Sequence, residues 1–487
     1  MTNSQQPKAP MHAVKVSSAP MSIPSGGDSE ARAARSAPLA FTNVDKRRIL
    51  QAADLRTKPG EVGALMRRAG VYPSSLGACR RQREAADLAA LAPQQRGHWA
   101  GVGGGPARAT IPAMDVQQAL PLLGGLSPAQ FMRRHWQKKP LLVRQAWPGV
   151  QPPISRRALF DLASVEGVES RLLSRVGGGW RLRHGPLARR ALPPLKQAAW
   201  TLLVQGLDLH WQPAHDLLQR FRFVPEARLD DLMISYASDG GGVGPHLDSY
   251  DVFLLQVQGR RRWRIGPVVD RSLVPGLPVR ILANFQPTEE WLLEPGDLLY
   301  LPPLWGHDGI AEGECMTCSV GFRAPAAVSL AQELLHQLAD NLEAPDRSDT
   351  LYSDAGQPAT DRPARLPAHL AQFARRALDR AMRDPLALDH ALGILMTEPK
   401  PRVWFETGGQ WVAGQGLLLD RRSRMLYDDH HVFINGEAFR AAGRDARLMM
   451  HLADCRQLDA TEAARLSPQA LELLGDWVAV GWLHAAP

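Results

Sequence analysis

Cysteine is scarce in this 487-residue chain, and long apolar runs are missing from it. Four cysteines are too few for the disulfide framework of a small secreted domain, and such sparse use favours a reducing compartment. No apolar run reaches the roughly 18 residues that a transmembrane helix requires. The opening residues also lack the apolar core of a secretory signal. We therefore expect a cytoplasmic protein without a membrane segment.

Net charge is low over most of the chain. The formal charge is +8, but residues 1–113 hold 16 Lys and Arg against 7 Asp and Glu, whereas the other 374 residues hold 41 against 42. A nearly neutral body has no overall electrostatic footprint for nucleic acid. All of the basic excess lies in the leading segment.

That leading segment differs from the rest of the chain. Residues 1–40 are rich in Ser, Pro, Ala and Gly, which predicts disorder. The stretches KPGEVGALMRRAGVYPSSL and CRRQRE that follow resemble the helix-turn-helix piece of insertion-sequence transposases. Either the segment is a fusion remnant without a role, or its arginines dock the chain on nucleic-acid phosphates. The docking residues would be Arg67, Arg68, Arg80, Arg81 and Arg83.

The remaining residues divide into three further regions. In residues 114–325, and mainly from Leu229 onward, short strands alternate with Gly and Pro turns, which predicts a barrel or double-sheet jelly roll. Residues 326–395 show the apolar spacing of helices. Residues 396–487 mix helix and strand, with a hairpin turn at Asn435-Gly436 and a last helix after Ser467. We expect a mainly β fold with added helices.

The stretch GPHLDSYDVFLLQ places two polar side chains at the start of an apolar strand. His246 and Asp248 lie two residues apart, so they project from the same face of a strand. His307 follows the strand LYLPP, 59 residues after Asp248. One carboxylate with two imidazoles is the ligand set of non-haem Fe(II) oxygenases, which leaves positions open for a co-substrate and O2. The spacing therefore indicates a metal site.

The stretch GRRRWRIG is expected to form the strand that returns from Val252–Val257, and its pattern predicts that Arg261 points inward. Arg261 shares a strand face with Trp263 and Ile265, so it faces the interior if they do. A buried guanidinium without an anion costs several kcal/mol. The anion is either an internal Asp or Glu, or the distal carboxylate of a bound dicarboxylate such as 2-oxoglutarate.

Residues 114–487 resemble the bacterial ribosomal oxygenases, which are JmjC-type hydroxylases that depend on Fe(II) and 2-oxoglutarate. The resemblance rests on HWQKKPLLV, WRLRHGPL, WTLLVQGLD, LDDLMISYA, GGGVGPHLDSYDVFLLQ, GRRRWRIG, EPGDLLYLPP and SVGFRAP. It implies a JmjC/cupin double-stranded β-helix over 114–325, a helical dimerisation region over 326–395 and a winged-helix-like domain over 396–487. The transposase-like residues 1–113 have no counterpart in that family.

The resemblance also implies an activity and a set of site residues. The activity is hydroxylation of an arginine in a large-subunit ribosomal protein, with release of succinate and CO2, by a homodimer. The metal ligands are then His246, Asp248 and His307, and the contacts with 2-oxoglutarate are Arg261 and Ser319. Candidates for contact with the substrate arginine, chosen because they flank the site in sequence, are Asp239, Tyr250 and Asp251.

Two other functions remain open from the residues. A cupin enzyme acting on a small molecule would share the barrel, although cupins usually pair an HxH motif with a Glu. A DNA-binding regulator would use the basic leading segment together with the winged helix. The presence of Asp248 as the second candidate ligand speaks against the first, and the neutral body speaks against the second.

Overall fold

The structure is a computed structural model that describes residues 114–341, 351–400 except 384, and 403–486 except 404, 407, 408, 410, 413 and 441. These residues all belong to one of the two compact units of the chain, Gln95–Pro487. The predictions for residues 1–113, including the helix-turn-helix and its arginines, lie outside the described residues. Within the described ranges, no helix has both the length and the hydropathy that crossing a lipid bilayer requires.

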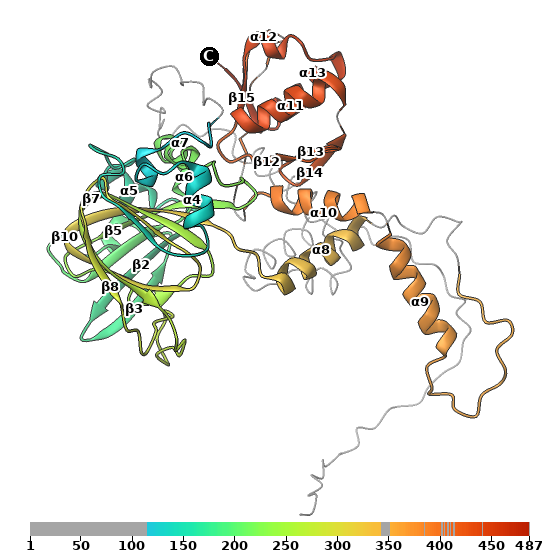
Figure 1. Cartoon of the computed structure of the whole chain (residues 1–487), viewed down its shortest axis with the longest axis horizontal. Coiled ribbons are helices and arrows are strands. Elements are labelled where there is room, and N and C mark those ends of the chain that lie inside the picture. Colours follow the sequence, from blue (N-terminus) through green and yellow to red (C-terminus); the bar gives the residue numbers. More distant parts are fainter. Residues whose placement is uncertain are drawn as a thin grey trace, which may run out of the picture. The chain divides into compact units, whose positions relative to one another are not determined.

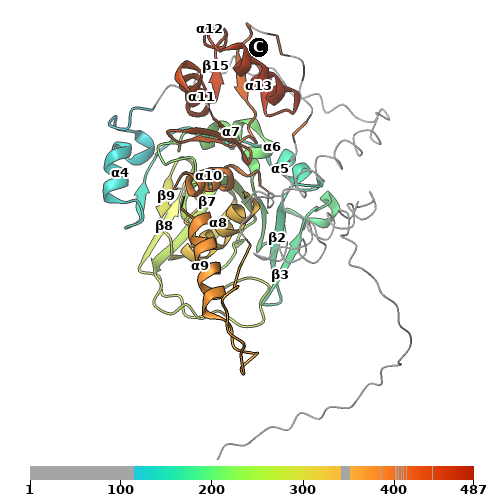
Figure 2. The same ribbon diagram turned by 90° about the vertical axis from the view of Figure 1, so that its right-hand side faces the viewer.

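A ten-stranded sheet forms the β-rich body of the protein (Figure 1). Its main path runs β1-β9-β7-β10-β5-β4-β2-β3, with β6 paired to β10 and β8 paired to β7. Figure 2 shows β7, β8 and β9 on one side of this body and β2 and β3 on the other. The strands are β1 (Leu141–Val143), β2 (Ser170–Val176), β3 (Gly179–His184), β4 (Trp200–Val204), β5 (Leu229–Ala237), β6 (His246–Leu247), β7 (Asp251–Pro267), β8 (Glu289–Leu293), β9 (Leu298–Leu301) and β10 (Trp305–Phe322).

Short helices precede or interrupt this sheet, and their ends follow the local sequence. The helix α4 (Pro128–Arg134) begins with a capping box in which Ser127 and Gln130 satisfy each other's backbone amides, and a proline stands in its first turn. The other helical segments of this region are η1 (Pro121–Leu123), α5 (Arg156–Leu162), η2 (Arg189–Ala191), α6 (Leu207–His210) and α7 (Gln212–Gln219).

One expectation about the strands is wrong. The arginine-rich stretch does not return from Val252–Val257; both belong to β7, which pairs antiparallel with β10 along nearly its whole length. Gly259 has φ +61, and a Cβ there would lie 2.0 Å from the carbonyl oxygen of Glu314. The glycine therefore permits an irregularity within one long strand, where the sequence pattern suggested a turn between two.

The two faces of this sheet pack different cores. One face contributes Phe253, Leu255 and Tyr300 to a large cluster that includes α4 and α5 residues. The other face, which we call the inner face, carries a smaller cluster. Its members are Val252, Leu254, Trp263, Ile265, Leu293, Leu299 and Leu301. The inner face is the one that bears the polar residues of the candidate site.

The C-terminal residues form helices and two three-stranded sheets, β15-β11-β16 and β12-β13-β14. The predicted hairpin turn is present, because Asn435 and Gly436 both have positive φ between β13 and β14. The last helix follows Ser467, as predicted, and the side chain of Ser467 caps it. The elements are α8 (Ala327–Asn341), α9 (Ala368–Ala381), α10 (Pro385–Thr397), β11 (Leu417–Leu419), β12 (Met425–Tyr427), β13 (His431–Ile434), β14 (Glu437–Arg440), α11 (Gly443–Cys455), β15 (Gln457–Leu458), α12 (Ala460–Ala463), α13 (Pro468–Ala479) and β16 (Leu483–Ala485).

Candidate metal and co-substrate site

The structure brings His246, Asp248 and His307 together at the start of β10. The pairing of β6 with β10 sets His246 directly opposite His307, with 4.2 Å between the ring centroids. Asp248 Oδ2 lies 3.9 Å from His246 Nε2 and 3.5 Å from His307 Nε2. One ligand atom from each residue can be chosen so that all lie within 4.8 Å of one another. A single cation can therefore reach all three groups.

Backbone carbonyls fix both imidazole rings in one tautomer. Nδ1 of His246 lies 2.8 Å from the carbonyl oxygen of Gly244, and Nδ1 of His307 lies 3.0 Å from that of Trp305. A carbonyl only accepts, so Nδ1 carries the proton and Nε2 keeps its lone pair toward Asp248. Burial, and then the neighbouring His246, lower the pKa of His307 to about 4. A metal requires an imidazole nitrogen with a free lone pair, and the orientation of both rings presents Nε2 for that purpose.

Arg261 lies on the same face of the sheet as His307. Their strands pair so that Arg261 faces Ala311, Trp263 faces Gly309 and Ile265 faces His307. The guanidinium is buried, with the side chain about 5% exposed. Its Nη1 donates to Ser235 Oγ at 3.0 Å, but Nε and Nη2 have no hydrogen-bond partner. Among the residues that the structure describes, no Asp or Glu forms an ion pair with it, which removes the internal-carboxylate alternative.

Further polar side chains line the inner face near Arg261, and sequence reasoning named only Ser319 among them. Thr317 Oγ1 donates to Gln256 Oε1 at 2.8 Å, and Thr317 lies opposite Ser235 in the sheet. Ser319 is buried two residues further along β10, on the same face, opposite Met233. Only the alternation within LMISYA could have indicated Ser235, because the partner strand that makes it useful lies some eighty residues away.

The three candidate substrate residues have different surroundings. The ring of Tyr250 is partly exposed, and its hydroxyl hydrogen-bonds Asp248; burial and that carboxylate raise the pKa of Tyr250. Asp239 is exposed, and its Oδ1 accepts from the backbone amide of Gly313 at 2.8 Å. Asp239 therefore holds the backbone of β10 at Gly313, and only Tyr250 among the three touches a residue of the triad.

The surroundings of Asp251 contradict the prediction that it contacts the substrate. It is fully buried. Its carboxylate accepts hydrogen bonds from Tyr300 at 2.7 Å, from Gln137 at 3.1 Å and from Arg228 at 3.2 Å. A carboxylate with three internal donors joins β7 to β9 and the segment after α4. Its position in sequence beside the site was misleading, because the side chain of Asp251 turns to the face opposite Val252.

Two protein-family models match the chain. A JmjC domain matches residues 216–330, and a ROXA-like winged helix matches residues 380–484. The first range contains all three residues of the triad together with Arg261. The second contains α10 to α13 and all but the last residue of the two three-stranded sheets.

Two curated bacterial proteins are similar in sequence. The ribosomal protein uL16 3-hydroxylase of Escherichia coli is 41% identical over 236 residues, covering 48% of this chain and 61% of that protein. A probable ribosomal oxygenase of Haemophilus influenzae is 37% identical over 205 residues, covering 41% of this chain and 50% of that protein. The chain thus aligns with half to three fifths of the length of these relatives.

Solved structures of E. coli YcfD are similar in fold and sequence over a longer range. One crystal structure has a TM-score of 0.65 and 30% identity, and the match covers 73% of this chain and 97% of that chain. Another, of the ribosomal oxygenase YcfD in complex with cobalt and 2-oxoglutarate, has a TM-score of 0.63, 30% identity and coverage of 74% and 98%. With nearly the whole length of that protein matched, this chain belongs to the JmjC-type bacterial ribosomal oxygenases.

Proposed function

We propose that the protein is an Fe(II)- and 2-oxoglutarate-dependent hydroxylase that acts on an arginine side chain of a large-subunit ribosomal protein. The observation that carries the proposal is the pairing, on one inner face, of a His-Asp-His triad with a buried arginine that lacks an anion. The similarity to a uL16 3-hydroxylase supports the choice of substrate.

The residues present fit an iron ion. Nε2 of His246, Nε2 of His307 and the carboxylate of Asp248 form a compact donor set of two neutral nitrogens and one anionic oxygen. Three protein ligands leave room for further ligands on the metal. Fe(II) with 2-oxoglutarate and O2 supplies oxidative decarboxylation to succinate and CO2, coupled to hydroxylation of a C–H bond.

The protein's own contribution is to bind, orient and exclude water. Arg261 holds the distal carboxylate of 2-oxoglutarate through Nε and Nη2, the two donors that have no partner in the protein. Ser319 and the Thr317–Gln256 pair line the same inner face and flank that carboxylate. Tyr250 donates to Asp248 and, being partly exposed, is placed to contact the incoming substrate arginine.

A turnover assay tests this function. The full chain is incubated with Fe(II), 2-oxoglutarate and a peptide that carries the arginine-bearing loop of the ribosomal protein. We expect succinate formation that depends on the peptide and a mass increase of one oxygen on its arginine. A matched peptide with lysine at that position should stay unmodified. Hydroxylation of a free small molecule instead of either peptide would contradict the proposal.

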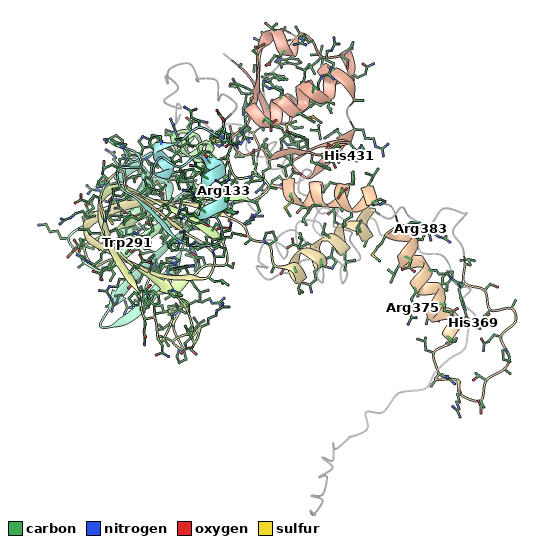
Figure 3. The ribbon with its side chains drawn as sticks, in the orientation of Figure 1. Arg133, Trp291, His369, Arg375, Arg383 and His431 are labelled. Atoms are coloured by element: carbon green, nitrogen blue, oxygen red, sulfur yellow. The ribbon has the colours of Figure 1, made fainter. Side chains whose placement is uncertain are left out.

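We further propose that the protein is a homodimer that associates through α8 and α9. Both helices carry exposed apolar side chains, among them Val328, Leu335 and Leu378, the last about 62% exposed. Figure 3 shows His369 and Arg375 along α9, so the helix carries polar side chains as well. An amphipathic helix with an exposed apolar side buries it against a partner.

If the protein is a dimer through these helices, one substitution on α9 should halve its molecular mass in solution. Leu378→Asp places a charge on the apolar side of α9 and should convert the dimer to a monomer at micromolar concentration. Gln372→Asp, on the polar side of the same helix, is the matched control and should leave the dimer intact. Size-exclusion chromatography with light scattering gives the mass. A wild-type chain that elutes as a monomer would contradict the dimer.

A further inference from the structure

A strip of uncompensated positive charge lies on β2, β3 and the segment that follows them. Between Ser170 and Leu207 the sequence has seven Arg and Lys and no Asp or Glu. The near-neutral total of the body conceals this local excess. We call these seven residues the hairpin patch: Arg171, Arg175, Arg181, Arg183, Arg189, Arg190 and Lys196.

Most of the hairpin patch is open to solvent. All of its members except Arg171 are exposed, and β3 is the edge strand of the ten-stranded sheet. Arg181 and Arg183 lie two residues apart on β3, so they project from one face of that edge. Arg175 and Trp180 are cross-strand partners on the other face. Both faces of the hairpin therefore present positive charge.

The hairpin patch forms no ion pair within the described part of the chain. Arg183 donates to the carbonyl oxygen of Ala191, and Arg189 lies over the ring of Phe160. Arg175 acts on the buried Asp308 without pairing with it, because it opposes the rise that burial causes in the pKa of that carboxyl. Two half-buried arginines of β7 differ in this respect. Arg262 pairs with Glu290 and Glu312, and Arg264 pairs with Glu290. Unpaired like charges on one surface repel each other, so the patch is suited to a polyanion.

An aromatic ring lies within the patch and beside the candidate site. The guanidinium of Arg175 lies 5.4 Å from the ring centroid of Trp180. A Cβ on Gly244, two residues before His246, would lie 3.1 Å from a carbon of the Trp180 ring. Arg175, Trp180, Arg181 and Arg183 also line one open hollow. Arginine next to a tryptophan face is the combination that holds a phosphate together with a stacked base.

We propose that the hairpin patch binds RNA next to the mouth of the candidate site. Phosphates would neutralise the exposed arginines, and an unpaired base would stack on Trp180. The choice of RNA over an anionic lipid surface rests on the proposed function, because a substrate that is a ribosomal protein is found beside RNA. The positively charged target arginine itself cannot neutralise the patch.

The test measures binding of a fluorescein-labelled oligouridine to the full chain by fluorescence anisotropy, without iron or 2-oxoglutarate. The patch variant is Arg181→Gln/Arg183→Gln/Arg190→Gln. Each lost phosphate contact reduces the salt slope of log K by about 0.7 for a single strand, so three lower it by about 2. We expect affinity at low salt to fall by at least about tenfold. The control, Arg260→Gln/Arg262→Gln/Arg264→Gln, removes the same charge from β7 and should change affinity less than about twofold.

A second variant separates stacking from charge. Trp180→Leu should weaken binding by about fivefold or more, the loss of one stacked base, without changing the salt slope. Circular dichroism and thermal melting check that each variant is folded. Equal losses in both arginine triples, or no loss in the patch triple, would overturn the proposal. So would patch-dependent binding to vesicles of phosphatidylglycerol and phosphatidylcholine with no binding to the oligouridine. Since no turnover is needed, RNA binding can succeed even if the hydroxylase assay fails.

Discussion

Replacing Asp248 by alanine is expected to abolish succinate formation while the protein stays folded. Asp248 supplies the only anionic donor of the triad, and its carboxylate lies within 3.9 Å of Nε2 on both histidines. Two neutral imidazoles alone hold a hard divalent cation weakly. The side chain is about 23% exposed, so its loss leaves no large cavity. His246→Ala should have the same effect, because it removes one of the two nitrogens.

Metal binding gives a readout of this prediction that does not depend on activity. A ligand that binds only the folded protein raises its stability by about 2.7 kcal/mol at one hundred times Kd. Added Fe(II) or Co(II) should therefore raise the Tm of the wild type but not of Asp248→Ala. Asp308→Asn is the control, because Asp308 is a buried carboxylate next to His307 but on the opposite face of β10. A variant at Asp248 that keeps near-full turnover would refute the ligand assignment.

The sequence predicts those parts of the site in which the residues that act together are close in sequence on one strand. The pairs His246–Asp248 and Arg261–Trp263 are two residues apart on a strand, so alternation alone places each pair on one face. The burial of Arg261 follows from its apolar neighbours, and the structure confirms it. Both inferences needed no knowledge of where the partner strands lie.

The alternation of side chains along one strand could not predict how strands that are distant in sequence pair with one another. Inner-face positions of β7 are even-numbered up to Gln256 and odd-numbered from Arg261, because the strand is irregular around Gly259. A glycine there is equally compatible with a turn, which is why one strand was interpreted as two. The roles of Ser235 and of Asp251 depend on register with β10 and β9, and register is fixed by tertiary packing.

The unpaired Arg261 leads to the second large effect. Arg261→Met should raise the KM for 2-oxoglutarate by about 10- to 150-fold, since a charge-assisted hydrogen-bond pair contributes about 1.5–3 kcal/mol and 1.4 kcal/mol corresponds to a factor of ten. The KM of Arg261→Lys should lie between those of the wild type and Arg261→Met, because an ammonium keeps the charge but loses the planar fork. Metal-dependent stabilisation should be unchanged in both variants, since Arg261 is not one of the triad.

A stability measurement without co-substrate separates a binding arginine from a structural one. With Nε and Nη2 buried and unpartnered, Arg261 weakens the fold until an anion arrives. Arg261→Met should therefore leave the Tm of the free protein equal or higher, and it should lose the further rise that 2-oxoglutarate gives the wild type. Arg262→Met, one residue away and paired with Glu290 and Glu312, should keep the wild-type KM. If Arg261→Met instead lowered the Tm and left the KM unchanged, Arg261 would support the barrel, and the distal carboxylate would bind elsewhere on the inner face.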